Sequence, residues 1–453
     1  MRLQQQHQNS IIAAWNAYWF RPAPLFNLAI CRIIFVSFQL FYVLLKPNYF
    51  NGLLERSSWS GAVYTPLPFV QLLTLPFGWS EPPPDIFLSI IYWITVGTGI
   101  LALFGFKTNW SLIPFSLGCL WMQEYLYSFG KFHHPEALMM MALFVLALSP
   151  SGRVLSVDDI GRRIKFNLNQ RQFKAFNIVN ENSNFSRWPL LFIQWMFALV
   201  YLSAGLAKLT NDGLDWFNGY TLQYYLLSDG LRWGSDIGVW LAHNHTMAVL
   251  SSLMAVWFEA TFFLVLIFPQ LVWIYIPLGA SFHIGIYLAQ RAPFFQFIAL
   301  YAVFIPWASI VQKFTARPWS SASNNKPEIL YDGQCPLCIR SMTVLCYFDW
   351  FNRLIYSDLE TRWQTVAKTH PQISLQACLE EMHLILPNGA VRKGFFAFRE
   401  ILRYIPILWP LRLVLYLPGS STFGPKIYKF VASRRQRFTQ CSFETCSINS
   451  PKK

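Results

Sequence analysis

The stretch IFLSIIYWITVGTGILALFGF, residues 86–106, contains no charged side chain. About 20 consecutive apolar residues in a helix span the hydrocarbon core of a bilayer, so this stretch predicts a transmembrane helix. Seven further apolar runs are long enough, or nearly so, and lie at 25–45, 110–129, 136–150, 189–209, 247–268, 271–290 and 295–311. We therefore expect an α-helical polytopic membrane bundle of about eight transmembrane helices.

The composition of the chain supports this class of protein. Of the 453 residues, 54% are hydrophobic and 13% are charged, whereas a soluble globular protein carries about 25% charged residues. The formal net charge of +14 indicates basic cytoplasmic loops and contact with anionic lipid headgroups. The chain has no basic stretch with interleaved aromatic residues that would suit a nucleic-acid surface. We therefore expect membrane lipids, and no nucleic acid, among its partners.

The charges of the loops predict how the bundle is oriented. Loop 210–246 is acidic, with Asp212, Asp215, Asp229 and Asp236 against Arg232 alone. Loop 151–188 is the most basic, with Arg153, Arg162, Arg163, Lys165, Arg171, Lys174 and Arg187. Because basic loops stay in the cytoplasm, we expect this loop and both termini to be cytoplasmic. The expected location is a bacterial inner (plasma) membrane.

A linker rich in Ser and Asn, SSASNNKP at 320–327, separates a transmembrane domain, 1–319, from a second domain, 328–453. The second domain reads as α/β. Its pattern predicts strands at 328–332 and 353–359, helices at 336–348, 395–405 and around 423–437, and a hairpin of 382–387 with 390–394. Asn388-Gly389 suits a type I′ turn in that hairpin.

The segment YDGQCPLC, residues 331–338, places a CxxC pair after a strand and at the start of a helix. A helix N-terminus offers free N–H groups and the positive end of a dipole, which stabilise a thiolate. We therefore expect Cys335 to attack a disulfide and Cys338, one turn on, to resolve the mixed disulfide. A CxxC near a βαβ pattern is typical of thioredoxin-like redox sites.

A structural zinc site is the alternative for these cysteines. Cys441 and Cys446 could complete a four-thiolate set with Cys335 and Cys338. The strand–CxxC–helix context favours redox chemistry over the metal site.

Residues 328–446 resemble the DCC family of thiol-disulfide oxidoreductases, which have a thioredoxin-like fold. The resemblance is carried by YDGQCPLC, by the NG–VRKG–FFAFREILR segment and by the closing run PKIYKFVASRRQRF with its nearby Cys pair. It implies that Asp332, Cys335 and Cys338 form the active-site motif. The expected partners are then protein or small-molecule thiols and disulfides.

Ionisable side chains inside predicted spans are functional candidates. In the expected threading, Lys208, His134 and His283 lie toward the outer half of the bundle and Glu259 lies near the middle, so these groups could face one cavity. Glu259 is a candidate for cofactor binding. Alternatively, Lys208 could snorkel to the interface and His134 could meet only headgroups.

The membrane part, about residues 15–311, resembles the HTTM domain that is shared with vitamin K-dependent gamma-carboxylase. The resemblance is carried by RPAPLFNLAICRIIF (21–35), HHPEALMMMALFVLALSPSGRVLSVDD (133–159), YLSAGLAKLTNDGLDWFNGYTL (201–222), FEATFFL (258–264) and GASFHIGIYLAQRAPFFQF (279–297). It implies that Lys208 is a base acting on a reduced quinone, with His134 and His283 in support. A base must be neutral, so we expect Lys208 to line an apolar cavity near both histidines without touching Glu259.

The sequence also departs from the carboxylases. Ala207 stands where they have a second lysine, and a small thiol domain replaces their large lumenal domain. A quinone-like or lipid-like ligand is therefore a better expectation than protein glutamate carboxylation.

Two functions follow from these observations. The first is a membrane-bound thiol-disulfide oxidoreductase whose bundle binds a quinone (vitamin K-like) or a similar lipophilic substrate. The second is a tethered thiol reductase whose bundle is only an anchor or a small-molecule transport module.

Overall fold

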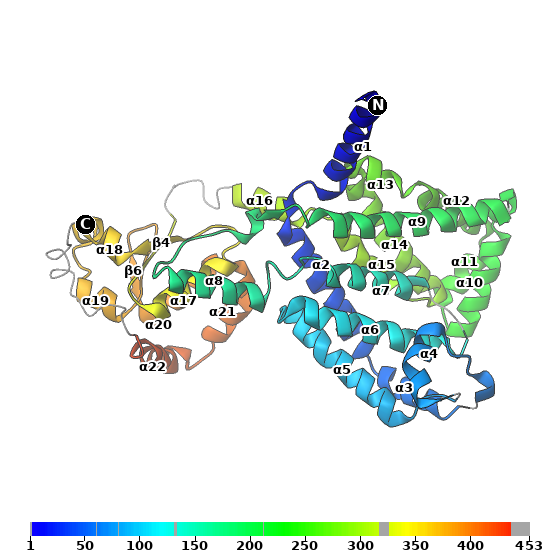
Figure 1. The fold of residues 1–453 in the computed structure, drawn as a ribbon, viewed down its shortest axis with the longest axis horizontal. Helices are drawn as coiled ribbons and strands as arrows, with labels where there is room; N and C mark the ends of the chain where they lie inside the picture. The colour runs from blue at the N-terminus through cyan, green and yellow to red at the C-terminus, as the bar shows by residue number, and fades with distance from the viewer. Residues whose placement is uncertain are drawn as a thin grey trace. The chain divides into compact units, whose positions relative to one another are not determined.

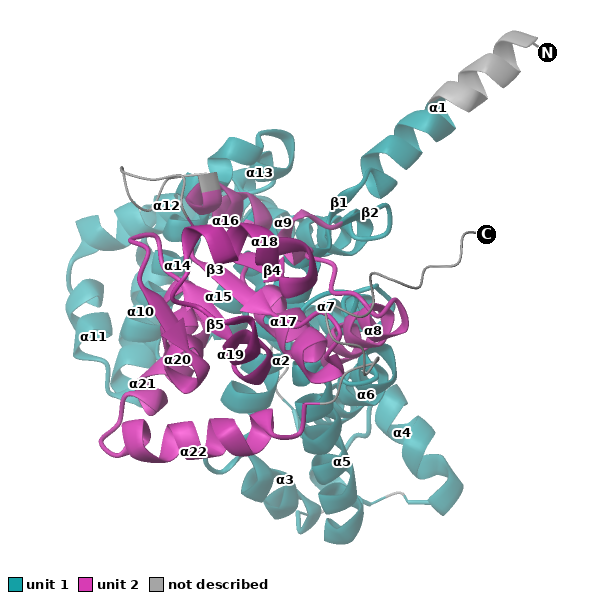
Figure 2. Ribbon diagram, turned by 90° about the vertical axis from the view of Figure 1, so that its left-hand side faces the viewer, with its two compact units in different colours: residues 1–156, 182–306 teal, residues 157–181, 307–453 magenta. Residues whose placement is uncertain are grey.

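The computed structural model describes residues 2–59, 61–79, 81–130, 134–211, 213–316 and 326–435, without the side chains of 2–10, 134 and 135. The chain forms two compact units. Residues 1–156 with 182–306 make the first, here called the membrane unit, and residues 157–181 with 307–453 make the second, the thiol unit (Figure 2).

Helices make up nearly all of the membrane unit (Figure 1). They are α1 (Arg2–Phe20), α2 (Leu25–Ser37) with its π-helical continuation η1 (Phe38–Leu44), α3 (Tyr49–Ser57), α4 (Pro68–Thr74), α5 (Asp85–Phe104), α6 (Thr108–Tyr127), α7 (His134–Ala147), α9 (Arg187–Asn211), α10 (Tyr220–Trp233), α11 (Asp236–Ala242), α12 (His245–Thr261), α13 (Leu264–Ile267), α14 (Val272–Gln290) and α15 (Phe295–Leu300). Short helices join them, namely η2 (Gly61–Val63), η3 (Leu75–Phe77), η5 (Gly213–Asn218), η6 (Pro269–Leu271) and η7 (Tyr301–Phe304). A two-residue pair of strands, β1 (Ala23–Pro24) and β2 (Asn182–Ser183), lies near the start of α2.

Five helical segments in the described part of the chain are long and apolar enough to cross a membrane. They are Leu25–Leu44, Asp85–Phe104, Arg187–Asn211, His245–Ile267 and Pro269–Gln290, and the broken pair Phe295–Phe304 with Trp307–Thr315 would be a sixth. The expected number of about eight is not confirmed. The run at 136–150 forms α7, of 14 residues, which at about 1.5 Å per residue is shorter than the hydrocarbon core.

Small residues let the helices of the membrane unit approach closely, as is typical of membrane bundles. A Cβ atom added at Gly118 of α6 would lie 1.9 Å from the hydroxyl of Thr95 on α5. A Cβ atom added at Gly205 of α9 would lie 2.8 Å from the backbone nitrogen of Ala260 on α12. The second contact brings α9 against the part of α12 that carries Glu259. Lys208, one turn after Gly205, is thereby placed beside that carboxylate.

The thiol unit is built on a four-stranded sheet in the order β4-β3-β5-β6. The strands are β3 (Glu328–Tyr331), β4 (Ile355–Asp358), β5 (His383–Ile385) and β6 (Val391–Lys393). β4 is parallel to β3, whereas β5 is antiparallel to both β3 and β6. The helices are α8 (Val157–Asn169), α16 (Trp307–Ala316), α17 (Pro336–Phe348), α18 (Leu359–Thr369), α19 (Leu375–Glu380), α20 (Gly394–Tyr404), α21 (Trp409–Leu415) and α22 (Ser420–Ala432).

The predicted hairpin is present, but its turn differs from the expected type. A type I′ turn needs positive φ at both central residues. Gly389 has φ +77°, whereas Asn388 is not among the residues with positive φ. The amide of Leu386 donates to the carbonyl of Ala390 at 2.8 Å, so three residues separate this pair. The glycine takes up the left-handed conformation alone, as in a three-residue hairpin loop.

The segment Val157–Glu181, expected only as a basic loop, packs within the thiol unit. Asn167 of α8 donates to the Thr343 hydroxyl of α17 at 2.9 Å, and the Phe173 ring meets Tyr331 edge-on. The linker expected at 320–327 lies mostly outside the described residues, and the expected boundaries at 319 and 328 remain predictions. Because residues 157–181 and the C-terminal domain belong to one compact unit, both must lie on the same side of a membrane.

Candidate active site

The CxxC pair lies where β3 passes into α17. Cys335 is the N-cap of α17, and its sulfur accepts a hydrogen bond from the backbone amide of Cys338 at 3.2 Å. Pro336 occupies the first helical position, where its missing N–H leaves no hydrogen bond unmade. Both sulfurs are free thiols and both side chains are buried. The strand, the helix and the cysteine placement expected from YDGQCPLC are therefore present.

Two aspartates hold the loop that carries Cys335. The carboxylate of Asp332 accepts from the amide of Gln334 at 3.0 Å. The carboxylate of Asp358, at the end of β4, accepts from the amide of Gly333 at 3.1 Å. These bonds satisfy the backbone donors before α17 and fix the approach of the chain to the helix.

The two thiols differ in their affinity for a proton. A hydrogen bond from the Cys338 thiol lowers the pKa of Cys335 to about 7, with help from the Cys338 amide and the charge of Arg435. Burial and the Asp332 carboxylate oppose this change. Donating that hydrogen bond raises the pKa of Cys338, and burial raises it further. Cys335 is therefore the thiolate of the pair at neutral pH.

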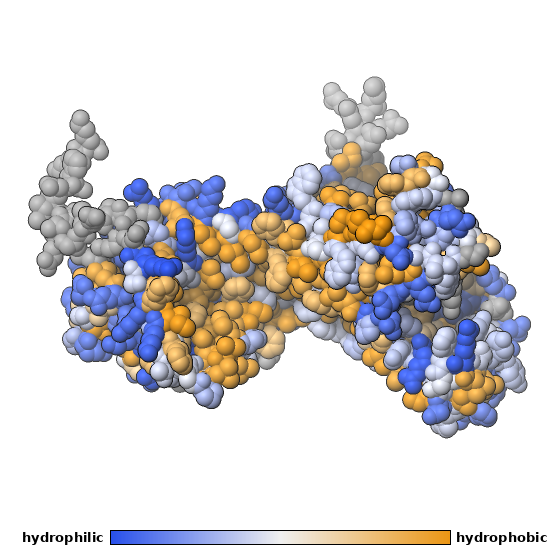
Figure 3. Space-filling model, turned by 90° about the horizontal axis from the view of Figure 1, so that it is seen from below, coloured by the Kyte–Doolittle hydropathy of each residue, from blue (hydrophilic) through white to orange (hydrophobic). Residues whose placement is uncertain are grey.

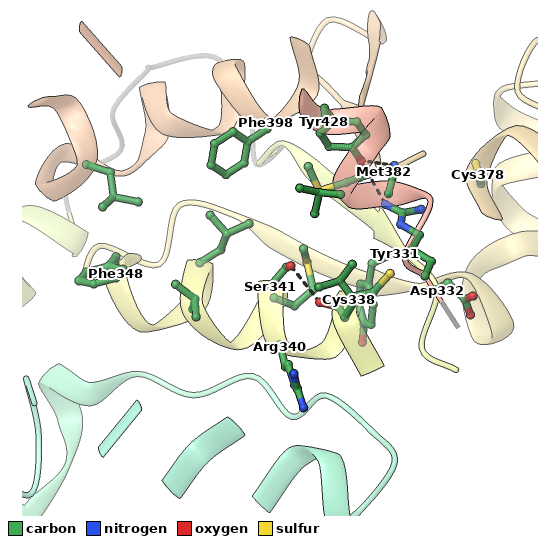
Figure 4. Close-up of a pocket in the computed structure, with 18 of the residues that line it drawn as sticks. Tyr331, Asp332, Cys338, Arg340, Ser341, Phe348, Cys378, Met382, Phe398 and Tyr428 are labelled. Carbon is green, nitrogen blue, oxygen red and sulfur yellow. Dashed lines mark hydrogen bonds between the residues drawn. The ribbon is translucent and has the colours of Figure 1, made fainter. Parts of the chain in front are cut away.

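A cavity of about 480 Å³ borders Cys338. Residues of α17, from Leu337 to Phe348, form one wall, and Phe398 and Tyr428 belong to the opposite wall (Figure 4). Its size falls within the range of about 300–1,000 Å³ that is usual for ligand pockets. Asp332 also lines it, whereas Cys335 does not. The position of the cavity therefore favours Cys338 as the sulfur that a substrate reaches first, whereas the lowered pKa favours Cys335 as the attacking thiolate.

Lys208 and Glu259 form an ion pair between α9 and α12. The Lys208 amine donates to the Glu259 carboxylate, and the side chains are 22% and 9% exposed. The amine also lies 5.5 Å from the centre of the Trp216 ring. The expectation that the two would not touch is wrong, because Gly205, one turn before Lys208, lets the two helices meet at this point.

His283 belongs to a different polar cluster. Its Nε2 lies 2.5 Å from the hydroxyl of Tyr201, which lies 2.6 Å from the hydroxyl of Tyr301. Tyr201 and Lys208 share α9, seven residues and so about 10 Å apart along its axis. Aromatic rings surround the cluster, namely Phe197, Phe258, Phe262, Phe294 and Phe297. His283 therefore has tyrosine partners, while Lys208 has a carboxylate.

Sequence reasoning singled out His283 but missed both tyrosines. A tyrosine in an apolar run looks like any other packing aromatic, and only the spacing from Tyr201 to Lys208, two helical turns, hinted at a shared face. The expected proximity of His134 to these groups is not tested, because its side chain lies outside the described residues.

Comparison with protein-family models matches residues 20–307 to the HTTM domain. That match covers more than half of the chain. The chain belongs to the HTTM family. A second match identifies residues 329–441 as a DCC1-like thiol-disulfide oxidoreductase domain. Both resemblances drawn from the sequence are thereby confirmed, in the expected order along the chain.

No curated protein and no solved structure matches this HTTM protein significantly. The HTTM match includes Lys208, Glu259 and His283, and the DCC1-like match includes both cysteines of the CxxC pair. The two candidate sites thus fall in separate families and in separate units of the chain.

The zinc alternative remains a prediction. Cys441 and Cys446 lie outside the described residues. Over the ranges that the structure covers, no group of three His, Cys, Asp or Glu side chains is placed to hold a metal ion. A metal site at the CxxC pair would have to draw its remaining ligands from outside these ranges, where Cys441 and Cys446 lie.

The pKa of Cys335 predicts how its reactivity depends on pH. Alkylation of this thiol by iodoacetamide should be half-maximal near pH 7, whereas an ordinary cysteine has a pKa of about 8.5. Arg435→Gln should move the midpoint to higher pH, because the guanidinium charge favours the thiolate. Mass spectrometry of the Cys335 peptide measures the rate, and Arg412→Gln is the matched control. An unchanged midpoint in Arg435→Gln would show that the charge of Arg435 does not lower the pKa of Cys335.

Proposed function

We propose that this protein is a membrane-bound enzyme that exchanges disulfides through Cys335 and Cys338. The observation that carries the proposal is the Cys335 sulfur at the N-cap of α17, stabilised as a thiolate beside a second thiol. The DCC1-like match supports it. Because β3, α17 and β4 form a βαβ unit with the CxxC pair at its turn, we assign the thiol unit a thioredoxin-like fold.

The proposed reaction balances without a further cofactor. The Cys335 thiolate attacks one sulfur of a substrate disulfide, and the other substrate sulfur leaves as a thiolate. Cys338 then loses its proton, attacks Cys335 and releases the second substrate thiol, which leaves a Cys335–Cys338 disulfide. Two electrons and the Cys338 proton pass from the pair to the substrate, the substrate sulfur that left as a thiolate takes its proton from solvent, and the reverse sequence oxidises a dithiol. Asp332 lines the same cavity as Cys338, and we assign it to the transfer of the Cys338 proton.

A redox titration of the full chain tests this function. Protein in lipid nanodiscs, equilibrated with glutathione buffers, should show a two-electron transition that disappears in Cys335→Ser and in Cys338→Ser. Cys119→Ala, which alters a buried thiol of the membrane unit, should leave the transition in place. A transition of full amplitude in Cys335→Ser would refute the proposal. Stoichiometric zinc that is lost in Cys441→Ser/Cys446→Ser would instead support the metal site.

The cytoplasmic location of both termini is also a proposal. It is supported by the basic residues of 157–181, since this segment and the thiol unit must share one side. In cells of the proposed bacterial host, a membrane-impermeant maleimide should label Gln364→Cys on α18 only after lysis. This labelling uses a chain without its other cysteines, and labelling of intact cells would place the thiol unit outside.

Quinone binding by the membrane unit is a second proposal, supported by the Tyr201–His283–Tyr301 cluster. Its hydroxyl and imidazole groups lie among aromatic rings and fit the polar oxygens and apolar ring of a quinone. Lys208 does not fit the role of a neutral base, because it is paired with Glu259. Purified protein that retains a near-ultraviolet-absorbing quinone would support the proposal. Protein without one would favour the anchor or transport role.

A further inference from the structure

The outer face of α21 and α22 exposes a continuous set of large apolar side chains. Phe423, Ile427 and Phe430 follow one another at helical spacing on α22 and are 65%, 63% and 61% exposed. Leu413 on α21 is 74% exposed. Orange surface gathers over this part of the thiol unit in Figure 3, which views the molecule from the side where α21 and α22 lie in Figure 1. Exposed apolar patches of this kind mark interaction surfaces.

The other face of α22 fixes the helix in this orientation. Tyr428 accepts a hydrogen bond from the amide of Met382 at 3.0 Å. A Cβ atom added at Gly424 would lie 2.3 Å from the Phe395 ring, so the helix lies tightly against α20. Arg435 donates to the carbonyl of Leu379 and to the Tyr428 hydroxyl, both at 3.1 Å. Because these contacts hold the inner face of α22 against the thiol unit, its apolar face points outward.

The charges of the same segment are all positive. Residues 401–435 contain no Asp or Glu, and their basic residues are Arg403, Arg412, Lys426, Lys429, Arg434 and Arg435. Arg412 lies over the Tyr416 ring at 5.2 Å and Arg434 over the Phe430 ring at 4.4 Å. Basic groups whose stems run along an apolar face are the arrangement by which peripheral helices bind anionic lipid surfaces.

The chain tethers the thiol unit to the membrane unit at several points. It passes between the membrane unit and the thiol unit after Ser156, after Glu181 and after Pro306. Three covalent connections hold the thiol unit within reach of the bilayer and give the lipid surface a high effective concentration. A lipid surface is therefore the occupant with matching polarity, matching charge and constant proximity.

We propose that the α21–α22 face lies in the interfacial layer of the anionic membrane leaflet next to the thiol unit. Its apolar side chains enter the acyl boundary, and its basic groups meet headgroup phosphates. Because Leu408, Leu411 and Val431 of this region also line the cavity beside Cys338, the cavity then faces the lipid. The inferred substrate is a lipophilic or membrane-anchored disulfide or dithiol, an inference that rests on the proposed thiol exchange.

A depth measurement tests the docking without any redox chemistry. The full chain carries one fluorophore at Leu413→Cys, with all native cysteines replaced, in nanodiscs containing phosphatidylglycerol. Nitroxide-labelled lipid should quench it, and the same label at Gln364→Cys on the polar helix α18 should stay unquenched. Absence of lipid quenching at Leu413→Cys would overturn the docking. Protection from aqueous iodide without lipid quenching would also overturn it, and would indicate a protein surface or a second copy as the occupant.

An exchange assay tests the substrate class. Phe430→Glu places a charge on the docking face and lies outside the cavity lining. We expect exchange with a disulfide attached to a lipid to slow at least tenfold in this variant, while exchange with a soluble disulfide keeps its wild-type rate. Equal rates for the lipid-bound disulfide in variant and wild type would refute the substrate class. Failure of the wild-type protein with both disulfides would refute the proposed function instead.

Discussion

Cys338→Ala should convert the protein into a trap that holds its substrates as mixed disulfides, whereas Cys335→Ala should reduce exchange to background. The reason is the difference between the thiols, because Cys335 is the thiolate at neutral pH and Cys338 holds its proton. Without Cys338, the mixed disulfide on Cys335 has no neighbouring thiol to resolve it. Non-reducing electrophoresis after rapid acid quenching measures the trapped species.

The position of the cavity points to the result that would contradict this prediction. Cys338 borders the cavity, and Cys335 is fully buried. If access rather than acidity decides which sulfur meets the substrate, then Cys335→Ala would trap and Cys338→Ala would not. Cys378→Ala, which alters another free and buried thiol of this unit, is the control and should trap nothing.

The parts of the thiol unit that could be predicted are those set by neighbouring residues. Tyr331 ends the strand, and Pro336 begins a helix that runs to Phe348, as the pattern of YDGQCPLC and the apolar run after it required. The hairpin at Asn388-Gly389 could likewise be predicted from neighbouring residues, although its turn type depended on the length of the loop. Strand, cap and turn signals act over a few residues and can be read from one sequence.

The parts that could not be predicted depend on contacts between distant segments. Asn167 and Thr343 are 176 residues apart, so nothing local showed that loop 157–181 would pack on α17. The Lys208–Glu259 pair depends on the approach of α9 to α12 at Gly205, which a glycine in an apolar run does not reveal. The expected number of about eight spans stays unconfirmed for a related reason, since apolar length alone does not separate α7, of 14 residues, from a helix that crosses.

The second large effect should come from breaking the Lys208–Glu259 pair. Glu259→Gln leaves a mostly buried ammonium without its carboxylate, and Lys208→Met leaves the carboxylate alone. Breaking a buried pair costs about 3–5 kcal/mol. Because Lys208 is 22% exposed, solvent should recover part of this, and we expect a loss of roughly 2–3 kcal/mol of unfolding free energy. Denaturant unfolding of the full chain in nanodiscs measures it, with the exposed Glu55→Gln as the matched control.

A double-mutant cycle shows whether the loss belongs to the pair. Lys208→Met with Glu259→Leu removes both charges, and we expect it to recover most of the stability lost by either single change. Lys208→Arg keeps a cation opposite Glu259 and should stay within about 1 kcal/mol of the parent. A coupling energy near zero would mean that water solvates the amine and the carboxylate separately. Glu259 would then not hold the Lys208 amine in place, which would contradict the structural role assigned to the pair.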